Sequence, residues 1–179
     1  MAHFVISAIG RDRPGIVAAI TEVLVRHHAN IEDSQMTILR GHFTMTLVVS
    51  AVDDAGVLEL RGQLEEAARK LELEGLYVAA LAELTPTVPR PTHVVTIYGV
   101  DHPGIVHGVS SALAERGVNI TDLETRLVEE EGRQPLYMMV LEVVLPPGLD
   151  QQQTESVLAA VAREQGVEVA VAAWEGDAL

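Results

Sequence analysis

Hydrophobic and polar positions change their spacing several times along the chain, and each change marks an element of secondary structure. Residues 3–9 and 43–50 alternate between apolar and polar side chains, which predicts two β-strands with one buried face each. Residues 14–28 instead repeat apolar side chains every three or four positions, which predicts a helix. A second helix is predicted from Val57 to a stop at Gly75, and residues 76–84 form a further predicted strand.

Between the first helix and the alternating strand at 43–50 lies a strand-like stretch, residues 30–39, that is polar on both faces. So polar a strand belongs at the edge of a sheet, and Arg40-Gly41-His42 supplies a short turn after it. Residues 53–56 read as a cap for the second helix. The element order is therefore β-α-β-β-α-β. With right-handed crossovers it predicts a four-stranded antiparallel sheet, order 4-1-3-2, with both helices on one face.

The same pattern occurs twice. Positions 5–33 and 94–122, which are 89 residues apart, share 11 identities in 29 aligned positions without a gap. In the second copy, strands are expected at 92–99, 119–128, 136–145 and 167–174, helices at 103–116 and 151–165, and a charged hairpin tip at 129–135. Prolines space the segment between the copies, so we expect domains at 1–85 and 92–179 joined by a linker at 86–91.

Each copy carries the same short motif where its first strand gives way to its first helix. The strand-forming run stops at Gly10 or Gly99, and Asp-Arg-Pro-Gly-Ile-Val at 12–17 or Asp-His-Pro-Gly-Ile-Val at 101–106 follows. Asp and Pro suit the first turn of a helix, and Gly lets another molecule approach the main chain. Because the free amides of a helix start attract anions, the motif suggests a site for a carboxylate or phosphate.

The composition of the chain argues against several classes of function. The net charge is −14, with one lysine and eleven arginines spread thinly, so no basic face for direct nucleic-acid binding is visible. The chain has no cysteine, and its histidines lack metal-ligand spacing, so we expect no metal and no cofactor. No apolar run reaches the roughly 20 residues of a membrane span, and no signal peptide is evident. We therefore expect no membrane partner and a cytoplasmic location.

The duplicated Asp-x-x-Gly-Ile-Val motif, the Asn-Ile pairs at 30–31 and 119–120, and the element order together resemble the ACT domain, a small amino-acid-sensing module. The tandem pair with its proline-containing linker resembles the glycine cleavage system transcriptional repressor family. The resemblance implies an α+β fold of two ferredoxin-like βαββαβ domains. It also implies that a small amino acid binds where two such domains meet, at the first strand-to-helix turn of one and the second-strand start of the other.

Carried over to this chain, the implied ligand-binding residues are Asp12, Gly15, Ile16, Asn30, Ile31, Asp101, His102, Gly104, Ile105, Asn119 and Ile120. The main-chain amides would take the ligand's carboxylate, and Asn or Asp oxygens its ammonium group. In the simpler alternative, Asp12 and Asp101 only cap their helices and the two Asn residues only shape turns. His102 is expected to contact a ligand or solvent rather than to act as an acid–base group.

No nucleophile–base set or phosphate-binding loop appears, so we expect no catalytic residue and no enzyme. The leading hypothesis is an amino-acid-binding regulatory protein that signals to a partner protein, with a homodimer as the expected assembly. The alternative is a regulatory subunit that confers feedback inhibition on an amino-acid biosynthetic enzyme. A small enzyme that uses Asp101 and His102 is a third, weaker alternative.

Overall fold

The computed structural model describes residues 2–51, 57–84, 89–128 and 135–176. Its backbone forms two compact units, Met1–Pro86 and Thr87–Leu179. Three expectations lie partly or wholly outside the described residues: the helix cap at 53–56, residues 86–88 of the linker, and 129–134 of the hairpin tip.

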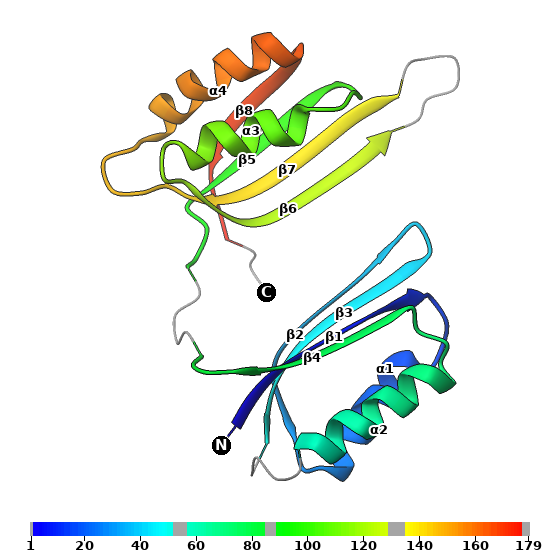
Figure 1. Ribbon diagram of the computed structural model, residues 1–179. Coiled ribbons are helices and arrows are strands. Elements are labelled where there is room, and N and C mark those ends of the chain that lie inside the picture. Colours follow the sequence, from blue (N-terminus) through cyan, green and yellow to red (C-terminus); the bar gives the residue numbers. More distant parts are fainter. Residues whose placement is uncertain (1, 52–56, 85–88, 129–134, 177–179) are drawn as a thin grey trace. The chain divides into compact units, whose positions relative to one another are not determined.

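The first unit contains four strands and two helices in the expected order (Figure 1). Its elements are β1 (Ala2–Arg11), α1 (Ile16–Arg26), β2 (Asn30–Leu39), β3 (His42–Ala51), α2 (Val57–Lys70) and β4 (Gly75–Leu81). All strand pairs are antiparallel and the sheet order is β2-β3-β1-β4, which confirms the predicted order. Every residue of β2 is exposed, as expected of a polar edge strand.

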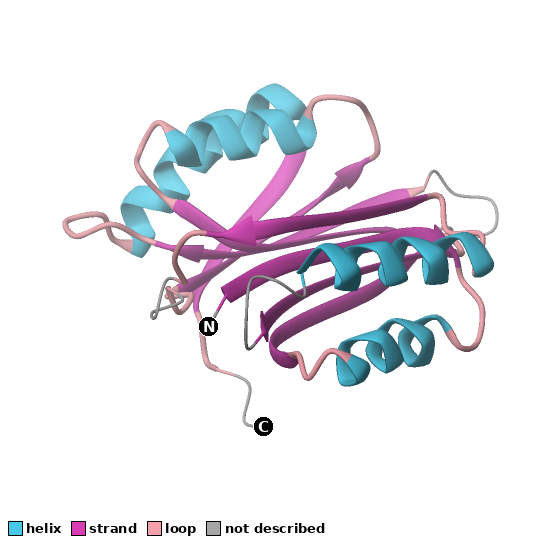
Figure 2. Ribbon diagram, turned by 60° about the horizontal axis from the view of Figure 1, so that its bottom comes forward, coloured by secondary structure: helices cyan, strands magenta, loops and turns pink. Residues whose placement is uncertain are grey.

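The second unit repeats this architecture, and in each unit both helices cover one face of the unit's own sheet (Figure 2). Its elements are β5 (His93–Val100), α3 (Ile105–Ala114), β6 (Asn119–Val128), β7 (Leu136–Val144), α4 (Gln151–Gln165) and β8 (Val167–Ala173). The sheet order β6-β7-β5-β8 matches that of the first unit. The predicted fold class, two ferredoxin-like βαββαβ domains, is confirmed.

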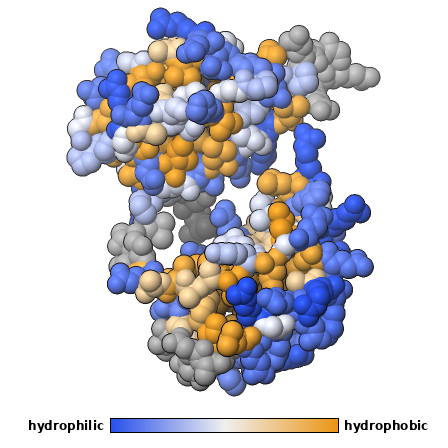
Figure 3. All heavy atoms as spheres, in the orientation of Figure 1, coloured by the Kyte–Doolittle hydropathy of each residue, from blue (hydrophilic) through white to orange (hydrophobic). Residues whose placement is uncertain are grey.

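Each unit has its own hydrophobic core between sheet and helices. Alternate residues of the central strands and one stripe of each helix supply it, including Leu24 and Leu64 in the first unit and Leu113 and Leu158 in the second. The outward faces of the first unit's helices are mostly polar on the side shown in Figure 3. The alternating and helical spacings of the sequence therefore identify the buried faces correctly.

Several element ends differ from the sequence-based expectation. β1 and β5 do not stop at Gly10 and Gly99 but continue to Arg11 and Val100, because β3 and β7 still pair with them there. Gly75 does not end α2 either. That helix ends at Lys70, and Glu72 turns the chain in a left-handed conformation with φ 50°, so Gly75 is already the first residue of β4.

Candidate functional site

The two motif glycines, Gly15 and Gly104, begin the first helix of each unit. Both are N-cap residues in a left-handed conformation, with φ 96° and 111°, where a side chain would be strained. Their carbonyls accept the first helical hydrogen bonds, from Ala19 at 2.9 Å and Gly108 at 2.8 Å. The alternative in which the Asp residues cap these helices is therefore wrong, because glycine occupies the N-cap position and no side chain accepts a capping bond there.

A hollow of about 500 Å³ lies over the first turn. Residues 12–18 line it together with Met36 of β2 and Phe43 of β3. A methyl group built on Gly15 would meet no atom within 4 Å, so the main chain is open to an approaching molecule. The amides of the first helical turn, at 16–18, have no partner inside the helix, and their residues line this space. The exposed Asp12 adds a carboxylate at the rim, and Ile16 forms part of the buried floor.

The corresponding turn of the second unit is covered by a residue from the end of α4. A methyl group on Gly104 would lie 3.3 Å from Oε1 of Gln165, and one on Gly108 would contact the same side chain. His102 closes the turn further, because its Nε2 lies 2.7 Å from the Gln165 carbonyl oxygen and its Nδ1 lies 3.1 Å from that of Pro103. Ile105 is buried in the core, so only its main chain could reach a ligand.

His102 is positioned to donate to both carbonyl oxygens when it is protonated. The Pro103 carbonyl and then the Gln165 carbonyl raise the pKa of His102, with a smaller contribution from the charge of Asp101. The end of a helix also favours a cation. Sequence reasoning assigned His102 to a ligand or to solvent and missed this contact, since Gln165 lies 63 residues away along the chain.

Arg13 occupies the position of His102 in the first unit and reaches the equivalent helix end differently. Its Nη1 lies 3.5 Å from Oε2 of Glu72, the residue that turns the chain after α2. Both partners are substantially exposed, so this ion pair holds the turn only weakly. The connection from the turn to the second helix is thus one contact with the Gln165 carbonyl in the second unit and an exposed ion pair in the first.

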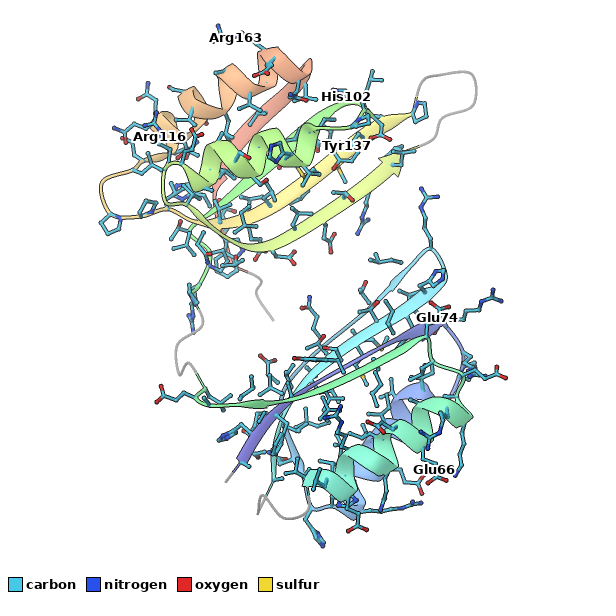
Figure 4. All side chains as sticks on the ribbon, viewed as in Figure 1. Glu66, Glu74, His102, Arg116, Tyr137 and Arg163 are labelled. Atoms are coloured by element: carbon cyan, nitrogen blue, oxygen red, sulfur yellow. The ribbon has the colours of Figure 1, made fainter. Side chains whose placement is uncertain are left out.

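The strands beside the two turns also differ in chemistry. Met36 and Phe43 border the first turn, and register places Thr125 and Tyr137 at the same points of the second sheet. His102 and Tyr137 lie at the same end of the second unit (Figure 4). Burial and the negative charge of Asp101 raise the pKa of Tyr137, while the Thr125 hydroxyl lowers it. Sequence reasoning missed all four strand residues, although Met36 is an apolar exception in a polar strand.

Asn30 and Asn119 do not join these turns within their own units. Asn30 pairs with Ser50, at the opposite end of the sheet from Gly10 and Phe43, and Asn119 pairs with Val144 in the same way. Both strands bulge just after the Asn-Ile pair, between Ile31 and Asp33 and between Ile120 and Asp122. One unit therefore cannot bring its own turn and its own Asn to the same small ligand.

The first bulge carries a polar cluster in which Asn30, expected from the sequence, meets Glu32 and Ser50, which were not expected there. Asn30 donates to Glu32 at 3.1 Å, and the Ser50 hydroxyl donates to the same carboxylate oxygen. The hydrogen bonds from Ser50 and then Asn30 hold the pKa of Glu32 below its ordinary value. In the second unit Thr121 replaces Glu32 and donates to the Glu142 carbonyl at 3.2 Å. The signal in the sequence was this difference between positions 32 and 121 of the repeat.

Two further kinds of feature are absent among the described residues. No group of three or more His, Asp or Glu side chains stands close enough to hold a metal ion in that part of the chain. Among the helices described there, none combines the length and the apolar composition that a membrane crossing requires.

Known proteins are similar to this chain in both sequence and fold. The chain is 31% identical over 169 residues to phosphoserine phosphatase SerB2 of Mycobacterium tuberculosis, an alignment that covers 93% of this chain but 39% of the phosphatase. It is 27% identical to the glycine cleavage system transcriptional repressor of Escherichia coli, covering 90% of this chain and 85% of the repressor. A crystal structure of an unknown protein from Galdieria sulphuraria superposes with a TM-score of 0.77 at 31% identity, over 97% of this chain and 98% of that one.

The family assignment follows from both halves of the chain. Family models described as the ACT domain match residues 2–75 and, separately, residues 93–164. These ranges fall on the two βαββαβ units, and each contains one Asp-x-x-Gly-Ile-Val turn. The chain belongs to the ACT domain family.

Proposed function

We propose that this chain is a non-catalytic regulatory protein that binds a small amino acid at its strand-to-helix turn and signals the bound state to a partner protein. The observation that carries the proposal is the open hollow at the first turn, where Gly15 leaves the main chain accessible. Its size, about 500 Å³, falls in the range of small-molecule sites. The similarity to a transcriptional repressor supports a regulatory role, and the net charge of −14 favours action through a protein rather than on nucleic acid.

The groups around the hollow match the two charged ends of an amino acid. The free amides after Gly15 provide donors for a carboxylate, and the helix dipole favours a negative group there. The carboxylate of Asp12 provides a partner for the ammonium group. The Asn half of the predicted site, Asn30 or Asn119, would have to be supplied by another ACT domain, as a homodimer could do.

A second candidate is a regulatory subunit that confers feedback inhibition on an amino-acid biosynthetic enzyme. The similarity to phosphoserine phosphatase SerB2 favours it, because there the matching region is 39% of a protein named as an enzyme. Co-purification from the native host separates the two candidates. A stoichiometric enzyme whose activity responds to an amino acid only in the presence of this chain would establish the subunit role.

Calorimetric titration of the chain with each of the twenty amino acids tests binding. The variant Gly15→Ala tests whether the amino acid binds at the first turn. The added methyl group enlarges a residue that lines the hollow, so we expect affinity for the bound amino acid to fall about tenfold or more. Gly148→Ala is the matched control, because Gly148 has a similar φ of 91° and an equally open Cβ position but lies far along the chain, in the second unit. Both variants carry the same backbone strain, so only a loss specific to Gly15→Ala reports on the site.

No heat from any amino acid at millimolar concentration would reject the proposal. Equal losses in the Gly15 and Gly148 variants would reject the assignment of binding to the first turn.

A further inference from the structure

We infer that the first turn selects amino acids with an apolar side chain, and that Met36 and Phe43 set this selectivity. The inference rests on the proposed function, since it assigns the class of ligand to the same hollow. It uses a different observation, namely the chemistry of the hollow's side wall rather than that of its helix start.

The polar residues that line the hollow belong to the turn, whereas the two strand residues that line it are apolar. Asp12, Arg13 and the free amides after Gly15 belong to the turn, and they suffice for the carboxylate and ammonium groups that every amino acid carries. With both charged ends held at the turn, we expect the ligand's side chain to point toward the strands. There it meets Phe43, which is 2% exposed, and Met36, which is 51% exposed.

Neither strand residue offers a hydrogen bond of useful strength. A serine hydroxyl or an aspartate carboxylate placed against Met36 and Phe43 would lose water without gaining a partner, which penalises binding. An aliphatic or thioether side chain would instead bury apolar surface, and Met adapts its shape to such contacts. Each methylene group buried there strengthens binding about fourfold. We therefore expect L-leucine or L-methionine to bind at least about 30-fold more tightly than glycine.

The second unit shows what a polar version of the same wall looks like. Thr125 stands where the first unit has Met36, and Tyr137 stands where it has Phe43. There Gln165 also lies against Gly104, and His102 contacts the Gln165 carbonyl. The repeat thus supplies a substitution pair that a βαββαβ unit of this chain already accommodates.

The test transfers that pair into the first unit and measures binding of glycine, L-serine, L-aspartate, L-valine, L-leucine and L-methionine by calorimetry. Met36→Thr with Phe43→Tyr should weaken L-leucine and L-methionine binding about tenfold or more, while glycine binding changes less than threefold. The reverse exchange in the second unit, Thr125→Met with Tyr137→Phe, is the matched control and should leave all affinities within twofold. Met36→Thr alone keeps the test informative if Phe43→Tyr impairs folding, because Met36 lies at the surface.

The outcomes separate the two hypotheses. If the unmodified chain binds none of the six probes and none of the remaining amino acids, the proposed function fails. If it binds glycine, serine or aspartate as tightly as leucine, or if the exchange in the first unit leaves the preference unchanged, the selectivity inference is overturned and the proposed function stands. A loss caused by the control exchange would also overturn it, since the second turn would then be the binding site.

Discussion

The turns before α1 and α3 share Asp, Pro, Gly, Ile and Val, yet a hollow lies over the first and the side chain of Gln165 lies against the second. The shared glycine takes the same left-handed conformation in both turns, whereas Arg13 and His102, which differ, contact different groups, the Glu72 carboxylate and the Gln165 carbonyl. Sharing a motif therefore does not mean sharing a site.

The largest effects are expected in the two cores, where the units are most alike. Leu24 and Leu113 occupy equivalent helix positions and are both 1% exposed. Truncating either to alanine should lower the stability of its own unit by about 3 kcal/mol, from lost burial and the cavity left behind. Trp174, the only tryptophan, lies in the second unit, so its fluorescence during urea unfolding reports on that unit.

Because each unit has a separate core cluster, we expect Leu113→Ala to lower the midpoint of the Trp174 transition and Leu24→Ala to leave it nearly unchanged. Hydrogen exchange of the β1 amides should become faster in Leu24→Ala and stay nearly unchanged in Leu113→Ala. Equal shifts of the Trp174 midpoint in both variants would mean that the two units unfold as one.

A smaller contrast concerns one residue in the turn that follows the first helix of each unit. Position 117 is glycine with φ 70°, and the equivalent position 28 is histidine with φ 50°. Both take part in the same reverse turn, in which the next residue's amide returns to Leu24 or Leu113. A left-handed conformation strains a histidine but not a glycine.

Exchanging the two residues tests this reading. We expect Gly117→His to lower the stability of the second unit by about 1 kcal/mol, and His28→Gly to raise that of the first by up to about 1 kcal/mol. Unit-resolved hydrogen exchange measures both. If His28→Gly destabilises, the histidine side chain must make a stabilising contact that outweighs its backbone strain.

A structural feature can be predicted from the sequence when it depends on residues that are neighbours along the chain. Alternation and helical spacing predicted the strands, the helices and the polar edge strand, because each depends on neighbours along the chain. They did not predict Glu72 or His28 in left-handed conformations, since non-glycine residues give no sign of it. The capping box of Asp150 and Gln153 at the start of α4 was readable from an Asp-x-x-Gln spacing and was overlooked.

The candidate site was predictable only in part. The repeat located both turns, but it could not show that Gln165 lies against Gly104, because that residue comes from the far end of the unit. The strand residues Met36 and Phe43 join the first turn through sheet register, which a motif confined to positions 12–17 does not contain.

The smallest expected effect is a pH dependence of stability in the second unit. It arises from the contact of His102 with the Gln165 carbonyl at the end of α4. Since the folded structure raises the pKa of His102, the stabilisation is fully present below the ordinary histidine pKa of about 6.5 and is lost as pH rises through the folded value. Once His102 is neutral, only one of its ring nitrogens can donate, so one carbonyl contact is lost. The urea midpoint of the Trp174 transition should therefore decrease between pH 6 and pH 8.5.

The variant His102→Gln removes the titration and keeps a neutral donor, so its midpoint should be nearly flat over this range. Arg13 provides the matched control, because a guanidinium stays charged throughout and Arg13→Gln should leave the pH slope of the Trp174 transition as it is in the unmodified chain. A slope that persists in His102→Gln would place the titrating group elsewhere. The contact with Gln165 would then hold the second turn closed without any help from a proton, and the difference between the two turns would be one of packing alone.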